Sequence, residues 1–155
     1  MVWFKQTIGH ACGLIALLHS VCNGSAKQFI TPDSDLDRML KECVPLKPLP
    51  RADVLYNSEA LEKAHMAAAY TGDSKAPSSL EPNGYHFISF VKGNDGHLYE
   101  LEGGWGGPID RAVLSEDEDV LSEKALDAGI RKYIKAADGN VEFSMVALAS
   151  SPDDA

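Results

Sequence analysis

The chain has 155 residues, of which 45% are hydrophobic and 24% are charged, as expected for one soluble globular domain. A formal net charge of −9 argues against a partner with a phosphate backbone, so we expect no nucleic-acid partner and leave a basic protein partner open. Three cysteines at unpatterned spacings argue against a disulfide framework and favour a reducing compartment. We therefore expect the protein in the cytoplasm, with the nucleus as a second location.

The N-terminal part predicts an extended approach followed by a buried helix. Residues 1–11 begin with apolar, β-prone side chains, and residues 12–22 are apolar almost all round, which predicts a central, buried helix. Lys5 and the apolar run at 11–18 imitate a short signal peptide, but polar residues interrupt the pattern, so export is not expected. No run approaches the length of a transmembrane helix, and no membrane partner is expected.

Two further helices and a long loop are expected next. The sequence Asp33-Ser34-Asp35 is an N-cap signature for a helix over about 35–43, and leucine and alanine recur at near-helical spacing over 51–70. Residues 71–84 are small, polar and rich in proline and glycine, and they are too many for a simple turn. Loops of this length in compact domains are usually functional lids or disordered segments.

Beyond the loop the hydrophobic period changes to two, which predicts strands. Residues 85–91 and 97–102 are expected to form a hairpin about the turn Gly93-Asn94-Asp95-Gly96. The remaining expected elements are a glycine-rich bend at 103–108, a helix over about 118–136 that the acidic residues 116–119 cap, and a last strand over 141–149.

The candidate nucleophile is Cys12, at the start of the expected buried helix. Unpaired N–H groups and the positive dipole end of a helix N-terminus favour a reactive thiolate. Gln6 lies six positions upstream (12 − 6 = 6), where its amide can donate a hydrogen bond to an oxyanion that forms near the sulfur. One alternative is a buried, inert thiol. Another is a zinc site, but it lacks paired C-x₂-C spacing, so no metal or other cofactor is expected. Its ligands would be His10, Cys12, His19 and Cys22.

The candidate base is His86, and the candidate group that orients it is Glu102. A cysteine nucleophile needs a base within hydrogen-bond reach, and the base needs an orienting partner. His86 opens a predicted strand directly after the long loop, and the hairpin returns Glu102 to the same end of the paired strands. Asp110 is the rival orienter, whereas His19, two turns into the apolar helix, is expected to be a core residue.

Several of these segments resemble the ubiquitin C-terminal hydrolases, and the resemblance covers nearly the whole chain. The matching segments are Gln6-Thr7-Ile8, Ala11-Cys12-Gly13 with the apolar helix after them, Ala76-Pro77-Ser78, His86-Phe87-Ile88, 96–103 and Val146-Ala147-Leu148. The resemblance implies a papain-like α+β fold, in which helices flank an antiparallel sheet and a buried central helix carries the nucleophile. It also implies one catalytic domain over 1–155 that lacks the N-terminal part of the family domain, with a crossover loop at about 70–84.

The resemblance further implies a monomeric thiol protease, a deubiquitinase that hydrolyses amide, ester or thioester bonds at the C-terminal glycine of ubiquitin. In that function Gln6 is the oxyanion donor, Cys12 the nucleophile and His86 the general base and acid. Glu102 departs from the family, which usually has aspartate at this position. The side chain of glutamate has one more methylene than that of aspartate, which requires a shifted backbone or another rotamer. The alternative is an inactive ubiquitin-binding remnant of the same family.

Overall fold

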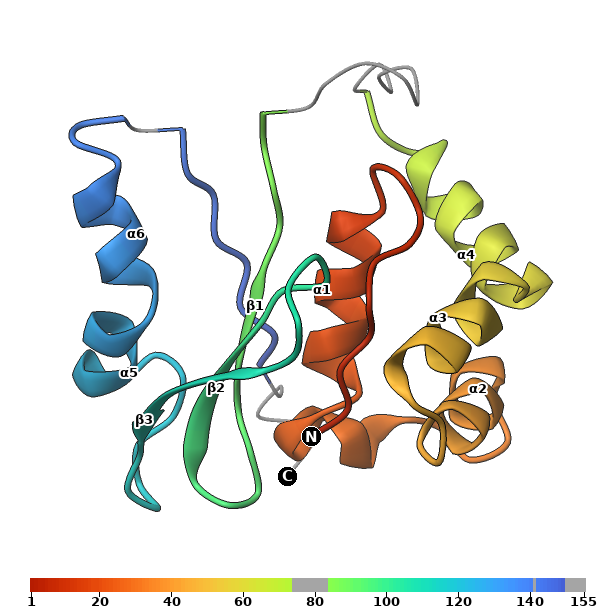
Figure 1. The fold of residues 1–155 in the computed structure, drawn as a ribbon, viewed down its shortest axis with the longest axis horizontal. Coiled ribbons are helices and arrows are strands. Elements are labelled where there is room, and N and C mark those ends of the chain that lie inside the picture. The colour runs from red at the N-terminus through yellow and green to blue at the C-terminus, as the bar shows by residue number, and fades with distance from the viewer. Residues whose placement is uncertain (74–83, 141, 150–155) are drawn as a thin grey trace.

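The computed structural model of the protein describes residues 1–73, 84–140 and 142–149 (Figure 1). The helices are α1 (Cys12–Val21), the 3₁₀ helix η1 (Gly24–Phe29), α2 (Asp35–Cys43), α3 (Pro48–Tyr56), α4 (Glu59–Ala69), α5 (Glu123–Ala128) and α6 (Ile130–Ala136). The strands β1 (Ser89–Lys92), β2 (His97–Leu101) and β3 (Ile109–Val113) form one antiparallel sheet in the order β1-β2-β3. Within the described ranges, no helix has the length and apolar character that a membrane crossing requires.

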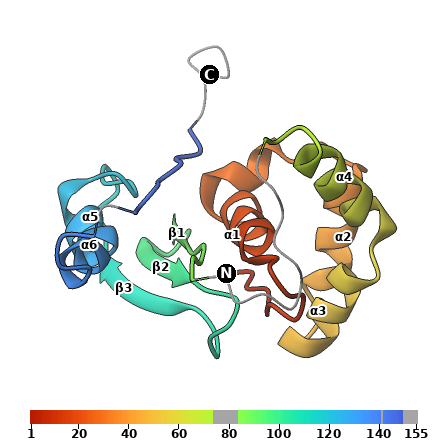
Figure 2. The same ribbon diagram turned by 90° about the horizontal axis from the view of Figure 1, so that it is seen from above.

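Helix α1 lies between the sheet and the other N-terminal helices. Figures 1 and 2 show α2, α3 and α4 on one side of α1, the sheet on its other side, and α5 and α6 beyond the sheet. This is the α+β class predicted from the sequence, with helices on both sides of an antiparallel sheet. Helix α1 is therefore covered by α2, α3 and α4 on one side and by the sheet on the other.

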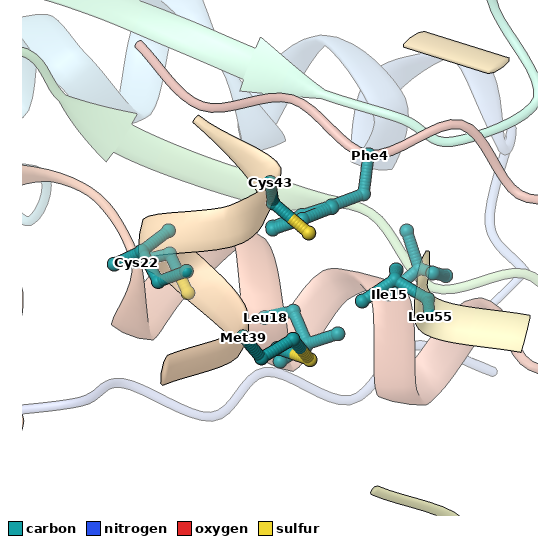
Figure 3. Close-up of a cluster of buried hydrophobic side chains, with 8 residues drawn as sticks. Phe4, Ile15, Leu18, Cys22, Met39, Cys43 and Leu55 are labelled. Carbon is teal, nitrogen blue, oxygen red and sulfur yellow. The ribbon is translucent and has the colours of Figure 1, made fainter. Parts of the chain in front are cut away.

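The main core forms where α1 meets α2 and α3. Its buried side chains are Phe4, Ile15, Leu18, Cys22, Met39, Leu40, Cys43 and Leu55 (Figure 3). Burial raises the pKa of the Cys22 thiol to about 12, so this cysteine stays protonated and inert near neutral pH. The prediction that α1 is buried almost all round is wrong on one face, because Leu17 is 56% exposed.

The extended segment before α1 is held by side chains rather than by a sheet. The Asn23 side chain accepts a hydrogen bond from the Val2 N–H at 2.7 Å and donates one to the Val2 carbonyl at 2.8 Å. His19 Nε2 accepts a hydrogen bond from the Phe4 N–H at 2.9 Å. Buried backbone groups must find partners, and here α1 and the residues after it supply them, which fixes the segment that leads to Gln6.

Helix α2 begins and ends as predicted, and the next predicted helix is wrong in one respect. The Ser34 hydroxyl accepts a hydrogen bond from the Asp37 N–H at 3.2 Å and caps α2. Instead of one helix over 51–70 there are two, because Ser58 caps α4 by accepting a hydrogen bond from the Leu61 N–H at 3.2 Å. A serine in the extended conformation starts the helix that follows and ends the one before.

The hairpin forms about the predicted turn, but its first strand is shorter than predicted. β1 starts at Ser89, opposite Leu101 at the end of β2, and residues 84–88 lie outside any strand. The chain bends away from the ladder after Leu101, so this preceding segment has no strand to pair with. β3, which the sequence analysis did not predict, pairs with β2 through a register shift between Leu98 and Tyr99.

The helix predicted over 118–136 is divided into α5 and α6 at Gly129. A Cβ atom at Gly129 would lie 3.0 Å from Cε1 of Phe90, so the ring of Phe90 approaches the backbone where the two helices meet. The predicted cap is also wrong. The hydroxyl of Ser122, rather than the acidic residues 116–119, accepts a hydrogen bond from the Ala125 N–H at 3.3 Å.

The last predicted strand does not form over the described residues 142–149. Figure 2 shows this segment leading away from the sheet, and its apolar side chains are exposed, with Val146 at 97%. A strand requires a ladder partner, and the described part of the chain pairs none with this segment. Val141 and residues 74–83 of the predicted crossover loop lie outside the described residues.

Candidate active site

Cys12 is the first residue of α1 and is 8% exposed. Ala11 before it has no side-chain oxygen, so its side chain caps none of the N–H groups in the first turn. His10 leads the chain into the helix with a φ of 56°, a left-handed conformation that non-glycine residues adopt rarely. The sulfur is therefore attached where unpaired helix N–H groups meet the positive end of the helix dipole.

Gln6 lies in the extended segment before this helix start. Its backbone N–H donates a hydrogen bond to the Gly103 carbonyl at 2.9 Å, and its side-chain Nε2 donates to the Ile8 carbonyl at 3.2 Å. Its Oε1 is buried and has no hydrogen-bond partner among the described residues. Because an amide nitrogen carries two hydrogens, the second N–H of Gln6 can still serve another acceptor.

His86 and Glu102 are in contact just beyond the end of the β1–β2 ladder. His86 Nε2 lies 2.7 Å from Glu102 Oε1. An ionised carboxylate can only accept, so Nε2 carries the proton of this bond and Nδ1 of the neutral ring is left as a base. The Glu102 side chain is 7% exposed and that of His86 is 46% exposed. The pair thus has a buried acid and an accessible imidazole.

Two contacts join α1 to the segment that carries His86. A Cβ atom at Gly13 would lie 3.6 Å from Cδ2 of Phe87, and the Ser20 and Ser89 hydroxyl oxygens are 2.8 Å apart. Figure 1 shows α1 and this segment descending in the same direction. Eight helical residues from Cys12 to Ser20 span about 12 Å, and three extended residues from His86 to Ser89 span about 10 Å. Measured from the Ser20–Ser89 contact along the axis of α1, the backbone positions of Cys12 and His86 therefore lie at a similar height.

Two residues that sequence reasoning missed hold the loop that carries Glu102. The Gly104 N–H donates to Glu102 Oε1 at 2.6 Å, and the Trp3 indole Nε1 donates to the Glu102 carbonyl at 3.0 Å. A buried indole N–H requires a partner, which is the one signal in the sequence that pointed to Trp3. The sequence contains no comparable signal for Gly104.

The other candidates have different partners. Asp110, the rival orienter, lies with its Oδ2 2.7 Å from Nδ1 of His97, away from the His86 contact. His19 is fully buried, as predicted for a core residue, and burial lowers its pKa to about 4, so its ring is neutral near pH 7. Across residues 1–73, 84–140 and 142–149, no group of three or more histidine, cysteine and acidic side chains is arranged to hold a metal ion.

Residues 1–135 match the family model described as ubiquitin carboxyl-terminal hydrolase, family 1. The chain is 36% identical over 149 residues to ubiquitin carboxyl-terminal hydrolase isozyme L1 of Sus scrofa, and the match covers 96% of this chain and 64% of that protein. It is 37% identical over 146 residues to isozyme L1 of Monodelphis domestica, covering 94% of this chain and 62% of that protein. The chain thus spans less than two thirds of the length of these curated relatives.

The fold is similar to that of the Trichinella spiralis UCH37 catalytic domain, which was solved bound to ubiquitin vinyl methyl ester. The two share a TM-score of 0.64 and 22% sequence identity, and the match covers 92% of this chain and 59% of that chain. This likeness confirms the predicted papain-like α+β fold. Given the family match over residues 1–135 and the 36% identity to isozyme L1, the chain belongs to family 1 of the ubiquitin carboxyl-terminal hydrolases.

Proposed function

We propose that the chain is a thiol-dependent deubiquitinase that hydrolyses amide, ester or thioester bonds at the C-terminal glycine of ubiquitin. The observation that carries the proposal is the 2.7 Å contact between His86 and Glu102, next to α1, where a Cβ atom at Gly13 would lie 3.6 Å from Cδ2 of Phe87. Family membership supports ubiquitin as the partner, and the Trichinella spiralis neighbour was solved bound to a ubiquitin derivative.

The proposed reaction has two halves, with Cys12 as nucleophile and His86 as base and acid. His86 Nδ1 takes the thiol proton, the Cys12 thiolate attacks the glycine carbonyl carbon, and His86 returns the proton to the leaving group as its bond to carbon breaks. Water then attacks the thioester while His86 takes a water proton, and the proton returns to the sulfur when the C–S bond breaks. Glu102 keeps the imidazole in the tautomer that this cycle requires.

Gln6 is proposed to stabilise the oxyanion that forms in each half. The N–H of its amide that the Ile8 carbonyl does not engage, together with the Cys12 backbone N–H, would donate to that oxygen. Removing one oxyanion donor in other enzymes costs about 3 kcal/mol of transition-state stabilisation. We therefore place Gln6 in the reacting site, although it contributes no proton to the chemistry.

A second candidate function is binding of ubiquitin without hydrolysis. One observation favours it: the His86 side chain is 46% exposed. A base that is only partly enclosed remains open to water and is held less firmly, which would weaken catalysis.

Treatment of the chain with ubiquitin vinyl methyl ester separates the two functions. A thiol hydrolase should gain the mass of one ubiquitin on Cys12, and Cys12→Ala should abolish the adduct. Cys22→Ala is the matched control, because it removes a cysteine that is 1% exposed in the core, and it should leave the labelling intact. Labelling that survives in Cys12→Ala would contradict the proposal, and binding of unmodified ubiquitin without any adduct would support the second function.

A further inference from the structure

We propose that Trp3 is a positioning residue, whose indole N–H fixes the backbone of Glu102 and thereby the direction of the His86 ring. The inference rests on the proposed thiol hydrolase function. It starts from a buried hydrogen bond of 3.0 Å between Trp3 Nε1 and the Glu102 carbonyl, which joins residues 99 positions apart in the sequence.

Trp3 is itself rigidly placed, which a positioning residue must be. Its side chain is 4% exposed and packs in a cluster with Val91 of β1 and Leu101 of β2. Its carbonyl accepts a hydrogen bond from Arg51 Nη1 at 2.6 Å, and Arg51 Nε also donates to the Cys43 carbonyl at 2.9 Å. The indole is thus fixed to the sheet through its ring and to the helical layer through its backbone.

Glu102 needs this support because it lies past the end of β2, where no ladder partner holds it. Its carbonyl receives one other, longer hydrogen bond, from the Trp105 backbone N–H at 3.3 Å. The ring of His86 lies in a segment without a strand partner and is hydrogen-bonded to Glu102. A displacement of the Glu102 backbone is therefore transmitted directly to the imidazole.

The same short segment also carries the proposed oxyanion donor. Three residues after Trp3, the Gln6 backbone N–H donates to the Gly103 carbonyl at 2.9 Å, beside the Trp3 bond to Glu102. Two parallel contacts thus tie segment 3–6 to 102–103. Trp3 consequently helps to fix the position of Glu102, the proposed orienting acid, relative to Gln6, the proposed oxyanion donor.

The test is a set of kinetic constants for release of a fluorescent group from the C-terminus of ubiquitin. Trp3→Phe keeps a large ring and removes the indole N–H, and we expect it to lower kcat about tenfold with KM unchanged. In a Glu102→Gln background the same change should have no further effect, because the acid it positions is already lost. Tyr133→Phe is the matched control: it removes a half-buried donor, 2.5 Å from the buried Glu100 of β2, and should lower stability without lowering kcat.

The role of Trp3 would be overturned if Trp3→Phe lowered kcat by the same factor in the wild-type and Glu102→Gln backgrounds. It would also be overturned if Trp3→Phe left kcat unchanged in the wild-type background. A wild-type chain without turnover would overturn the hydrolase function, and the role of Trp3 is then decided by proton NMR. The His86 Nε2 proton, identified by its loss in Glu102→Gln, should shift or broaden in Trp3→Phe, and an identical signal would overturn the role. Should Trp3→Phe fail to fold, β-benzothienylalanine at position 3 preserves the ring shape without the N–H and gives the same two readouts.

Discussion

Two histidine–carboxylate contacts of the same length lie on or beside the sheet. His86 meets Glu102 at 2.7 Å beyond the open end of the β1–β2 ladder, and His97 meets Asp110 at 2.7 Å across β2 and β3. The first pair follows a segment beside α1, since a Cβ atom at Gly13 would lie 3.6 Å from Cδ2 of Phe87, whereas Figure 2 shows β3 farther from α1. Distance alone therefore does not distinguish the two acids, and the proposal of Glu102 as the orienting acid rests on the position of its pair relative to α1.

This pair of contacts provides a matched test of the orienting acid. Glu102→Gln should lower kcat for ubiquitin C-terminal hydrolysis by about 10²-fold or more, because the amide no longer favours the tautomer with the proton on His86 Nε2. Asp110→Asn should change kcat less than about twofold, because its partner His97 lies outside the proposed site. The reverse ranking in a side-by-side assay would assign the orienting role to Asp110.

His19 predicts a pH dependence of stability. Burial lowers the pKa of His19 in the folded chain from the ordinary 6.5 to about 4. Between these values the unfolded state binds the proton and the folded state does not, so the free energy of unfolding falls as the pH is lowered from about 6.5 to about 4. Over this whole pH range the free energy of unfolding falls by about 3 kcal/mol.

Urea unfolding at several pH values in that window measures the effect. His19→Gln should flatten this part of the profile, whereas His65→Gln, at an exposed position of α4, should keep it. A His19→Gln profile that runs parallel to the wild type would show that His19 does not account for the loss.

At the scale of elements, Gly103 allows the N-terminal segment to approach the loop that carries Glu102. A Cβ atom at Gly103 would lie 2.8 Å from Cβ of Gln6 and 2.9 Å from Cγ2 of Ile15. These distances are too short for real contacts, so an added methyl group must push apart the two segments that bear Gln6 and Glu102.

Gly103→Ala should therefore lower the free energy of unfolding by about 1–3 kcal/mol in a urea titration. The matched control is Gly106→Ala, since a Cβ there meets no atom within 4 Å, and its change should stay within about 0.5 kcal/mol. Similar stabilities for the two variants would contradict the close approach at Gly103.

The boundaries of the elements show what sequence patterns can and cannot predict. Ser34 with its acidic neighbours predicts α2, because the cap and the first turn are local. Ser58 offers the same local cap signal, but leucine and alanine spacing continues through it, so the pattern predicts one helix where there are two. Gly129 could not be assigned in this way, since the break it allows depends on Phe90, 39 residues away (129 − 90 = 39).

At the scale of the whole molecule, segments far apart in the sequence carry the residues of the proposed site. The contact between His86 and Glu102 could be predicted from local motifs, because the two residues flank one hairpin, whereas the proposed roles of Cys12 and Gln6 at one helix start stay predictions. The supports could not be predicted, because they join distant segments: the Trp3 indole to the Glu102 carbonyl, and Ser20 to Ser89. Contacts of this kind follow from packing, which no local spacing specifies.

The most direct measurement is a crystal structure of the chain after reaction with ubiquitin vinyl methyl ester. The account predicts a bond from the Cys12 sulfur to the ubiquitin derivative and a His86 ring nitrogen within about 4 Å of that sulfur, with the Glu102 contact retained. An adduct on another cysteine, or a His86 ring turned away and separated from the sulfur by more than about 8 Å, would contradict it.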